Sequence, residues 1–98
     1  MKNRGDQDEI LIKLFGSVSR VRILMLLICR PGQLLYQREI MFETGLALQP
    51  VQRELTNLVE LGIVKKREGD NRVYYQIDPA SPLFKPLKGI CEFASKGE

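Results

Sequence analysis

The sequence contains no histidine among its 98 residues, so it lacks the side chain that most often serves as a general base or metal ligand. It also lacks a glycine-rich phosphate-binding loop, paired cysteines at zinc-site spacing, and a nucleophile next to a suitable base. These absences argue against an enzyme, and we expect neither a metal ion nor a cofactor.

Long apolar runs are absent as well. The longest covers residues 23–29, which is too short to cross a bilayer. The first residues, MKNRGDQDE, do not contain the apolar stretch of a signal peptide. We therefore expect a cytoplasmic protein with no membrane partner.

Cysteine is scarce, and the two cysteines, Cys29 and Cys91, both lie in apolar segments. Free cysteine usually behaves as a small buried hydrophobic residue, and a reducing compartment disfavours a disulfide. We predict two buried thiols, with a disulfide as the less favoured alternative.

The composition is that of a globular protein, with 44% apolar residues in a chain long enough for one small domain. The net charge is +3, from 15 Lys and Arg against 12 Asp and Glu. This mildly basic balance permits an anionic partner such as nucleic acid but does not require one.

Apolar spacing predicts two helices in the first third of the chain. From Glu9, apolar residues recur at helical intervals as far as Val18. Ser19 can cap a second helix that begins at Arg20 and runs to a Pro-Gly pair. This second helix is apolar on nearly every side, which indicates burial on all sides or packing against another chain.

The rest of the chain predicts a mixed pattern of elements. In order, these are an extended piece at 34–36, a short helix at 37–44, a helix at 48–61, a hairpin at 63–77 and a last helix at 83–94. In the short helix we expect Ile40, Met41 and Phe42 to point inward and Gly45 to end it.

Two helices joined by a tight turn and followed by a two-stranded ribbon form a helix-turn-helix with a wing. The predicted fold class is therefore mainly α with a small β-hairpin: a winged helix-turn-helix with additional N- and C-terminal helices. We expect one domain over 9–95, which includes terminal dimerisation helices, after a flexible N-terminus over 1–8.

Pro50 lies near the front of the predicted helix at 48–61. Inside a helix, proline costs roughly 3 kcal/mol because it removes a hydrogen bond and clashes with the preceding turn. If the helix begins at Ala47 or Leu48, Pro50 falls in the first turn, where its missing N–H has no helical acceptor anyway. We predict this start, although Ala47 offers no side-chain oxygen as a cap.

This helix carries an apolar inward face and a polar outward face. Gln and Asn can pair with adenine, and Arg with guanine, by two hydrogen bonds each. The basic hairpin that follows could reach phosphates beside a groove. Either feature alone is commonly solvated surface, but their order favours DNA contact. The predicted DNA-binding residues are Gln37, Arg38, Gln49, Gln52, Arg53, Thr56, Asn57, Lys65, Lys66, Arg67, Asn71 and Arg72.

The two adjacent tyrosines of the hairpin point to opposite faces of a strand. We expect Tyr75 inward with Val73 and Ile77, and Tyr74 outward near the DNA backbone.

Several segments together resemble winged helix-turn-helix regulators of the arsenical-resistance-repressor-like (ArsR-like) superfamily, in a branch related to modules found with nucleotidyltransferase domains. These are LFGSVSRVRILMLL, LYQREI, TGLALQPVQRELTNLVELGIVKKREGDNRVYYQID and SPLFKPL. The resemblance covers about residues 10–90. It implies a cytoplasmic DNA-binding transcriptional regulator, usually a homodimer, with the helix at 48–61 in the major groove and the wing at 65–73 along the backbone.

Three departures limit what the resemblance carries over. The paired cysteines or His and Asp clusters of metal-sensing members are missing, so metal sensing is not implied. No nucleotidyltransferase segment is present, and the sequence identifies no effector. Ala47 and Leu48 stand where relatives tend to have Ser and Pro, which weakens the expected helix start.

A homodimer follows from two apolar stripes beyond the compact winged helix. The core of a single chain could bury the apolar stripe of one terminal helix. The second stripe would then stay exposed, which soluble monomers seldom tolerate. The alternative is that both stripes pack on their own domain. The predicted dimerisation residues are Ile10, Leu11, Leu14, Leu87, Ile90 and Phe93. A winged helix that binds another protein without specific DNA binding remains the alternative function.

Overall fold

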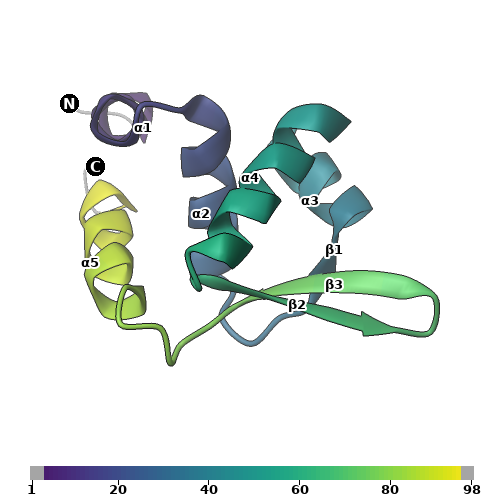
Figure 1. Cartoon of the computed structure of the whole chain (residues 1–98). Helices are drawn as coiled ribbons and strands as arrows, with labels where there is room; N and C mark the ends of the chain where they lie inside the picture. The colour runs from purple at the N-terminus through teal and green to yellow at the C-terminus, as the bar shows by residue number, and fades with distance from the viewer. Residues whose placement is uncertain (1–3, 96–98) are drawn as a thin grey trace.

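The computed structural model describes residues 4–95, and within them the chain is mainly helical with a small antiparallel sheet (Figure 1). The elements are α1 (Arg4–Phe15), α2 (Val18–Ile28), β1 (Leu35–Tyr36), α3 (Gln37–Thr44), α4 (Leu48–Glu60), β2 (Val64–Gly69), β3 (Arg72–Ile77) and α5 (Phe84–Ser95). Their order is the predicted one, with the additional helices at both ends.

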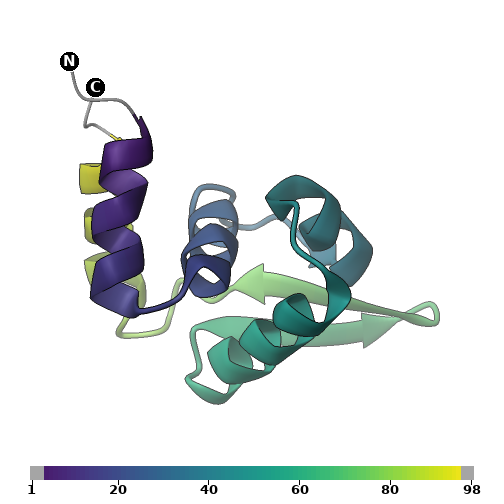
Figure 2. The same cartoon turned by 90° about the horizontal axis from the view of Figure 1, so that it is seen from above.

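Helix α2 is the centre of the molecule. It contacts α1, α3, α4 and α5, and its residues Ile23, Leu24, Leu27 and Ile28 are all buried in the main core. Figure 2 shows α2 between the pair of terminal helices on one side and α3 and α4 on the other. The apolar pattern of this helix is thus explained by burial within one chain.

The start of α2 corrects the predicted cap. The helix begins at Val18, and the Ser17 hydroxyl oxygen accepts a hydrogen bond from the Arg20 N–H at 3.1 Å. Ser17, not Ser19, is therefore the N-cap, because its extended backbone points the hydroxyl at the first unpaired amides.

The sheet has three strands in the order β1-β3-β2, where the sequence predicted only the hairpin. Strand β1 pairs antiparallel with β3, with Leu35 opposite Tyr75 and Tyr36 opposite Tyr74. The extended piece before α3 thus satisfies its backbone polar groups on the hairpin edge, a long-range pairing that the local pattern does not contain.

The terminal helices lie side by side, as both views of the ribbon show (Figures 1 and 2). Helix α1 begins at Arg4, so the predicted flexible segment over 1–8 is helical from residue 4, and residues 1–3 lie outside the described part. Leu11 is buried against Val21, and Leu87 is buried in the main core.

The assignment of Leu11 and Leu87 to a dimer interface is therefore wrong, because both side chains already pack within their own chain. Ile90 is half-buried and packs near Leu11. Of the predicted dimerisation residues, Ile10, Leu14 and Phe93 remain exposed, at 46%, 64% and 63%. Part of each terminal apolar stripe is thus buried within its own domain.

Two further expectations about burial are wrong. Phe42 is 85% exposed, because it lies on the side of α3 opposite the buried Ile40. Cys29 is exposed, since α2 ends at Ile28 and Cys29 is its C-cap, whereas Cys91 is buried as predicted. Gly45 ends α3 in the left-handed conformation (φ 73°), as expected.

Candidate nucleic-acid interface

Helix α4 begins at Leu48 with Ala47 as its N-cap, which confirms the start predicted from Pro50. Pro50 lies in the first turn, and the first amide with a helical acceptor is that of Val51, which donates to the Ala47 carbonyl oxygen at 3.3 Å. The proline therefore removes no hydrogen bond that the helix would otherwise make.

The two faces of α4 separate as predicted. Val51, Leu55 and Leu58 are at most 1% exposed and fix the helix to the core. The outward side chains line one shallow hollow along the helix; they are Gln49, Gln52, Arg53, Thr56, Asn57 and Glu60. The structure thus brings all five of the predicted DNA-binding residues of this helix together, with the carboxylate of Glu60 at its C-terminal end.

One charged residue of α4 was not anticipated. Glu54 is 2% exposed, and its Oε1 accepts a hydrogen bond from Arg20 Nε at 2.8 Å. Arg53 Nε lies 3.7 Å from the other carboxylate oxygen. The spacing of Val51, Glu54, Leu55 and Leu58 is that of one helical face, so periodicity alone could have indicated the burial of Glu54.

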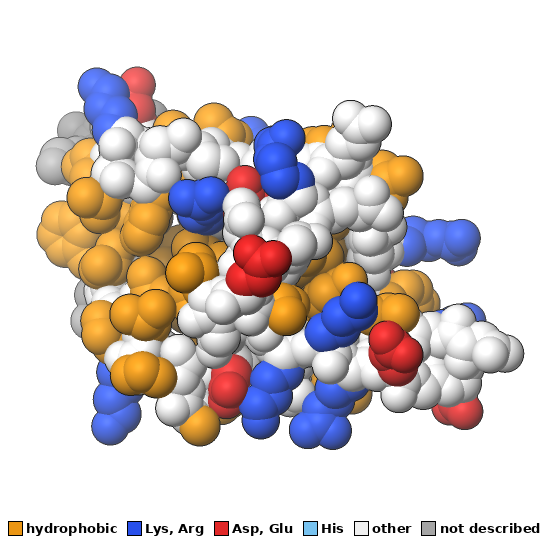
Figure 3. Space-filling model, in the orientation of Figure 1, with side chains coloured by type: hydrophobic (Ala, Val, Ile, Leu, Met, Phe, Trp, Pro, Cys, Tyr) orange, Lys and Arg blue, Asp and Glu red, His pale blue; other side chains and the backbone are white. Residues whose placement is uncertain are grey.

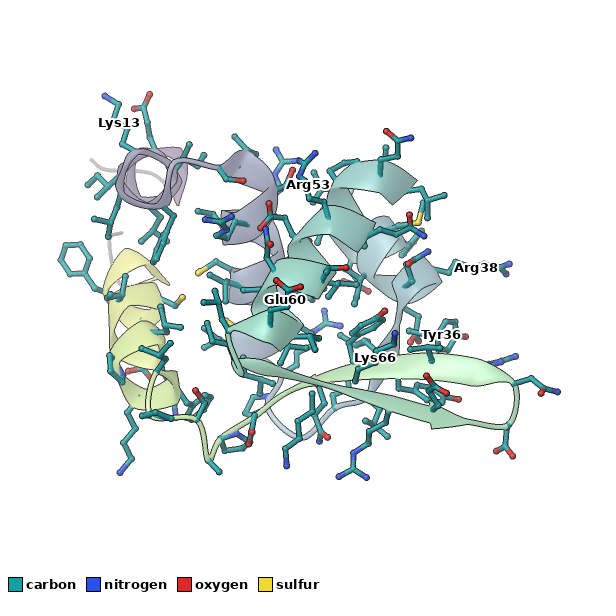
Figure 4. All side chains as sticks on the ribbon, viewed as in Figure 1. Lys13, Tyr36, Arg38, Arg53, Glu60 and Lys66 are labelled. Atoms are coloured by element: carbon teal, nitrogen blue, oxygen red, sulfur yellow. The ribbon has the colours of Figure 1, made fainter. Side chains whose placement is uncertain are left out.

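The buried Glu54 carboxylate lies near the guanidinium group of Arg53. The Arg53 side chain is 63% exposed, and its only ion pair among the described residues is the long one with Glu54. Figure 4 shows Arg53, Glu60 and Lys66 on the same side of the molecule.

The predicted wing corresponds to the hairpin of β2 and β3. Asp70 and Asn71 form its turn with φ of 50° and 65°, the left-handed conformations that a tight hairpin turn requires. Alternation along β2 places Lys65 and Arg67 on one face and Lys66 on the other. The predicted basic residues of the wing therefore point to both sides of the ribbon.

The basic residues of the wing differ in their partners. Lys65 Nζ lies 3.8 Å from the Asp78 carboxylate. The Arg72 guanidinium lies 5.0 Å from the centre of the Tyr36 ring, a cation–π contact. Lys66 and Arg67 are exposed and form no ion pair within the part of the chain that the structure describes.

The positions of Tyr74 and Tyr75 on β3 agree with the prediction only in part. Tyr75 packs against the main core, which confirms its inward position. Tyr74 is half-buried, and its ring meets the Tyr36 ring edge-on at 5.7 Å. Tyr74 is therefore a packing partner of Tyr36 at the sheet edge instead of an open outward residue.

The helix before α4 contributes one clearly accessible cation. Arg38 is exposed and points away from the body of the molecule, whereas Gln37 is half-buried (Figure 4). The Glu39 carboxylate accepts a hydrogen bond from the Tyr36 N–H at 3.0 Å and so holds the start of α3.

The surface that carries α4 and the wing has mixed charge. Figure 3 shows basic side chains at several points of this face with acidic ones between them. Within residues 9–93, no three His, Cys, Asp or Glu side chains are placed to hold a metal ion. Of the helices described, none combines the length and hydropathy that a membrane span needs.

Comparisons with protein families, with curated proteins and with solved structures find no match to this chain. The residues of the candidate interface are therefore interpreted from their own chemistry and geometry.

Proposed function

We propose that this protein is a winged helix-turn-helix transcriptional regulator that acts in the cytoplasm and binds double-stranded DNA in a sequence-specific manner. Helix α4 enters the major groove, α3 supports it, and the wing follows the phosphate backbone. The observation that carries the proposal is the outward face of α4, which groups Gln, Arg, Thr and Asn side chains on a helix anchored by three buried residues.

The chemistry of that face suits base edges. Gln52 and Arg53 lie one turn into the helix, where a docked recognition helix comes nearest to the bases. Glutamine can pair with adenine and arginine with guanine. Lys66 and Arg67 of the wing, which make neither an ion pair nor a cation–π contact among the described residues, suit phosphates, which carry most of the affinity of such complexes.

We also propose that the protein acts as a homodimer. Ile10 and Leu14 on α1 and Phe93 on α5 are exposed on two helices that pack together, and burial against a second copy would remove them from water. A two-fold axis at this end would present two copies of α4 to one face of a duplex.

A protein-binding module is the alternative, and Phe42 is the observation that favours it. This side chain is 85% exposed on α3, which would lie close to the DNA in the main proposal. Aromatic side chains are enriched at protein interfaces. A protein partner that covers Phe42 would use the same end of the molecule without reading bases.

The test is a selection of bound fragments from a random duplex library, followed by affinity measurements on the selected duplex and a scrambled one. We expect the selected duplex to bind at least tenfold more tightly, a difference of about 1.4 kcal/mol. Affinity for both should fall steeply with added salt through counterion release. Equal affinity for both duplexes would refute specific recognition, and the absence of measurable binding to any duplex would favour the protein-binding alternative.

A further inference from the structure

A second hollow lies away from the outward face of α4, and both apolar and charged side chains line it. It measures about 470 Å³ and lies between α1, α2 and the end of α3. Ile12, Val21, Met25 and Leu26 supply the apolar lining. This volume is within the range of roughly 300–1,000 Å³ that small-molecule sites occupy.

The charged side chains that line this hollow are two cations, Arg22 and Arg30, and one carboxylate, Glu43. Arg30 Nη2 lies 3.0 Å from Glu43 Oε1, so this cation is neutralised by a neighbour on α3. Arg22 has no ion pair within the described part of the chain, and its Nη1 donates to the Thr44 carbonyl oxygen at the long distance of 3.4 Å. One guanidinium group that lines the hollow therefore has no carboxylate partner among the described residues.

We propose that this hollow binds a small amphipathic carboxylate, with its apolar tail over Met25 and Leu26 and its carboxylate on Arg22. A guanidinium group and a carboxylate match each other in geometry and form charge-assisted hydrogen bonds. A single unpaired cation suits a monoanion better than a phosphate with two charges. The tail buries the side chains of Met25 and Leu26, which are half-buried in the chain alone.

The alkylation rate of Cys29 can report on binding at this site. Cys29 is exposed and lines the hollow, whereas Cys91 is 3% exposed in the core. A ligand in the hollow covers Cys29 and slows its alkylation by iodoacetamide. Mass spectrometry of the modified protein distinguishes the two thiols, so the measured rate belongs to Cys29.

The experiment uses octanoate as the probe and octanol, which has the same tail without the charge, as its neutral counterpart. We expect octanoate to slow Cys29 alkylation in a saturable manner and to bind at least tenfold more tightly than octanol in calorimetry, as one charge-assisted contact provides. Arg22→Gln should weaken octanoate binding about tenfold and leave octanol binding unchanged.

Matched variants separate the site from other causes. Lys85→Gln removes an exposed cation of α5 that belongs to neither proposed site and should leave octanoate binding unchanged. Arg22→Lys keeps the charge and should retain most of the affinity, which guards against a folding defect in Arg22→Gln. The proposal is overturned if octanoate leaves the Cys29 alkylation rate unchanged or if folded Arg22→Gln binds octanoate as the parent does.

Discussion

Arg20 on α2 and Glu54 on α4 form the ion pair that joins the central helix to the candidate recognition helix. Arg20 Nε lies 2.8 Å from Glu54 Oε1, and the Glu54 side chain is only 3% exposed while that of Arg20 is 33% exposed. The carboxylate is thus buried on the inner face of α4, directly beside the outward Arg53. This pair fixes the position of α4 by a charged contact as well as by apolar packing.

We predict that Arg20→Gln lowers the free energy of unfolding by about 2 kcal/mol, because it leaves a buried carboxylate without its main partner. The loss is below that of a fully buried pair since Arg20 is partly solvated. Urea unfolding measures it. Arg30→Gln, which breaks the more exposed pair with Glu43, is the control and should cost less than about 1 kcal/mol. Equal effects of the two variants would contradict a special role for the Arg20–Glu54 pair.

The candidate recognition helix α4 gives the second prediction. Arg53→Ala should weaken binding to the selected duplex by about 1–3 kcal/mol and relax the preference at one base position, if Arg53 pairs with guanine. Gln52→Ala should act similarly at a neighbouring position. Electrophoretic mobility shift on a set of single-base variants measures both. If both variants bind the selected duplex as tightly as the parent, α4 is not the reading helix.

The wing gives the third prediction. Lys66→Gln should weaken binding about equally to selected and scrambled duplexes and reduce the slope of log affinity against log salt by about 1, because one phosphate contact is lost. Lys13→Gln is the matched control, since Lys13 lies on α1 far from the wing (Figure 4). A loss confined to one base position would argue against phosphate contact by Lys66.

The exposed apolar residues of the terminal helices give the fourth prediction. Leu14→Glu combined with Phe93→Glu should convert a dimer to a monomer and weaken binding to a two-half-site duplex, because the charges cannot be buried against a second copy. Sedimentation equilibrium measures the oligomeric state. Substitution of Leu87 is unsuitable here, since that residue is buried in its own core. A monomeric parent chain at tens of micromolar, roughly the range of a weak dimer, would refute the homodimer.

Burial of Cys91 gives the fifth prediction. Desolvation, with a smaller contribution from Cys29, raises the pKa of the Cys91 thiol from 9.0 to about 11. The unfolded chain therefore loses this proton at lower pH than the folded one. Stability is unaffected by this group below pH 9 and should fall by about 2–3 kcal/mol between pH 9 and pH 11.

Urea unfolding across this range, with Cys91→Ala beside the parent, isolates the contribution of the thiol. The variant should lose less stability between pH 9 and pH 11 than the parent, although its starting value is lower. Cys29→Ala, at the exposed position, should follow the parent closely. Parallel curves for the parent and Cys91→Ala would contradict a raised pKa.

The local features of the fold were readable from the sequence. The start of α4 follows from Pro50, since a fixed φ and a missing N–H are tolerated only in the first turn. The end of α3 follows from Gly45, and the hairpin turn from the residues at 70–71 that tolerate positive φ. Each of these depends on a few consecutive residues, so no distant part of the chain was needed.

The polar face of α4 was equally readable, because helical periodicity separates its outward residues from Val51, Leu55 and Leu58. The ion pair that its buried Glu54 forms could not be predicted from the sequence. The partner of Glu54 is Arg20, which lies 34 positions earlier in the chain. A side-chain pattern gives the face of a residue but not the element that packs against it.

The order of the elements and the polar face of α4 could be predicted from the sequence alone, because backbone preferences and periodicity act over one or two turns. Long-range packing was needed to show that β1 pairs with β3, that Leu11 and Leu87 are buried within their own chain, and that Cys29 lies at a surface hollow. These outcomes depend on which surfaces meet in three dimensions, where segments far apart in the chain compete to bury the same apolar area.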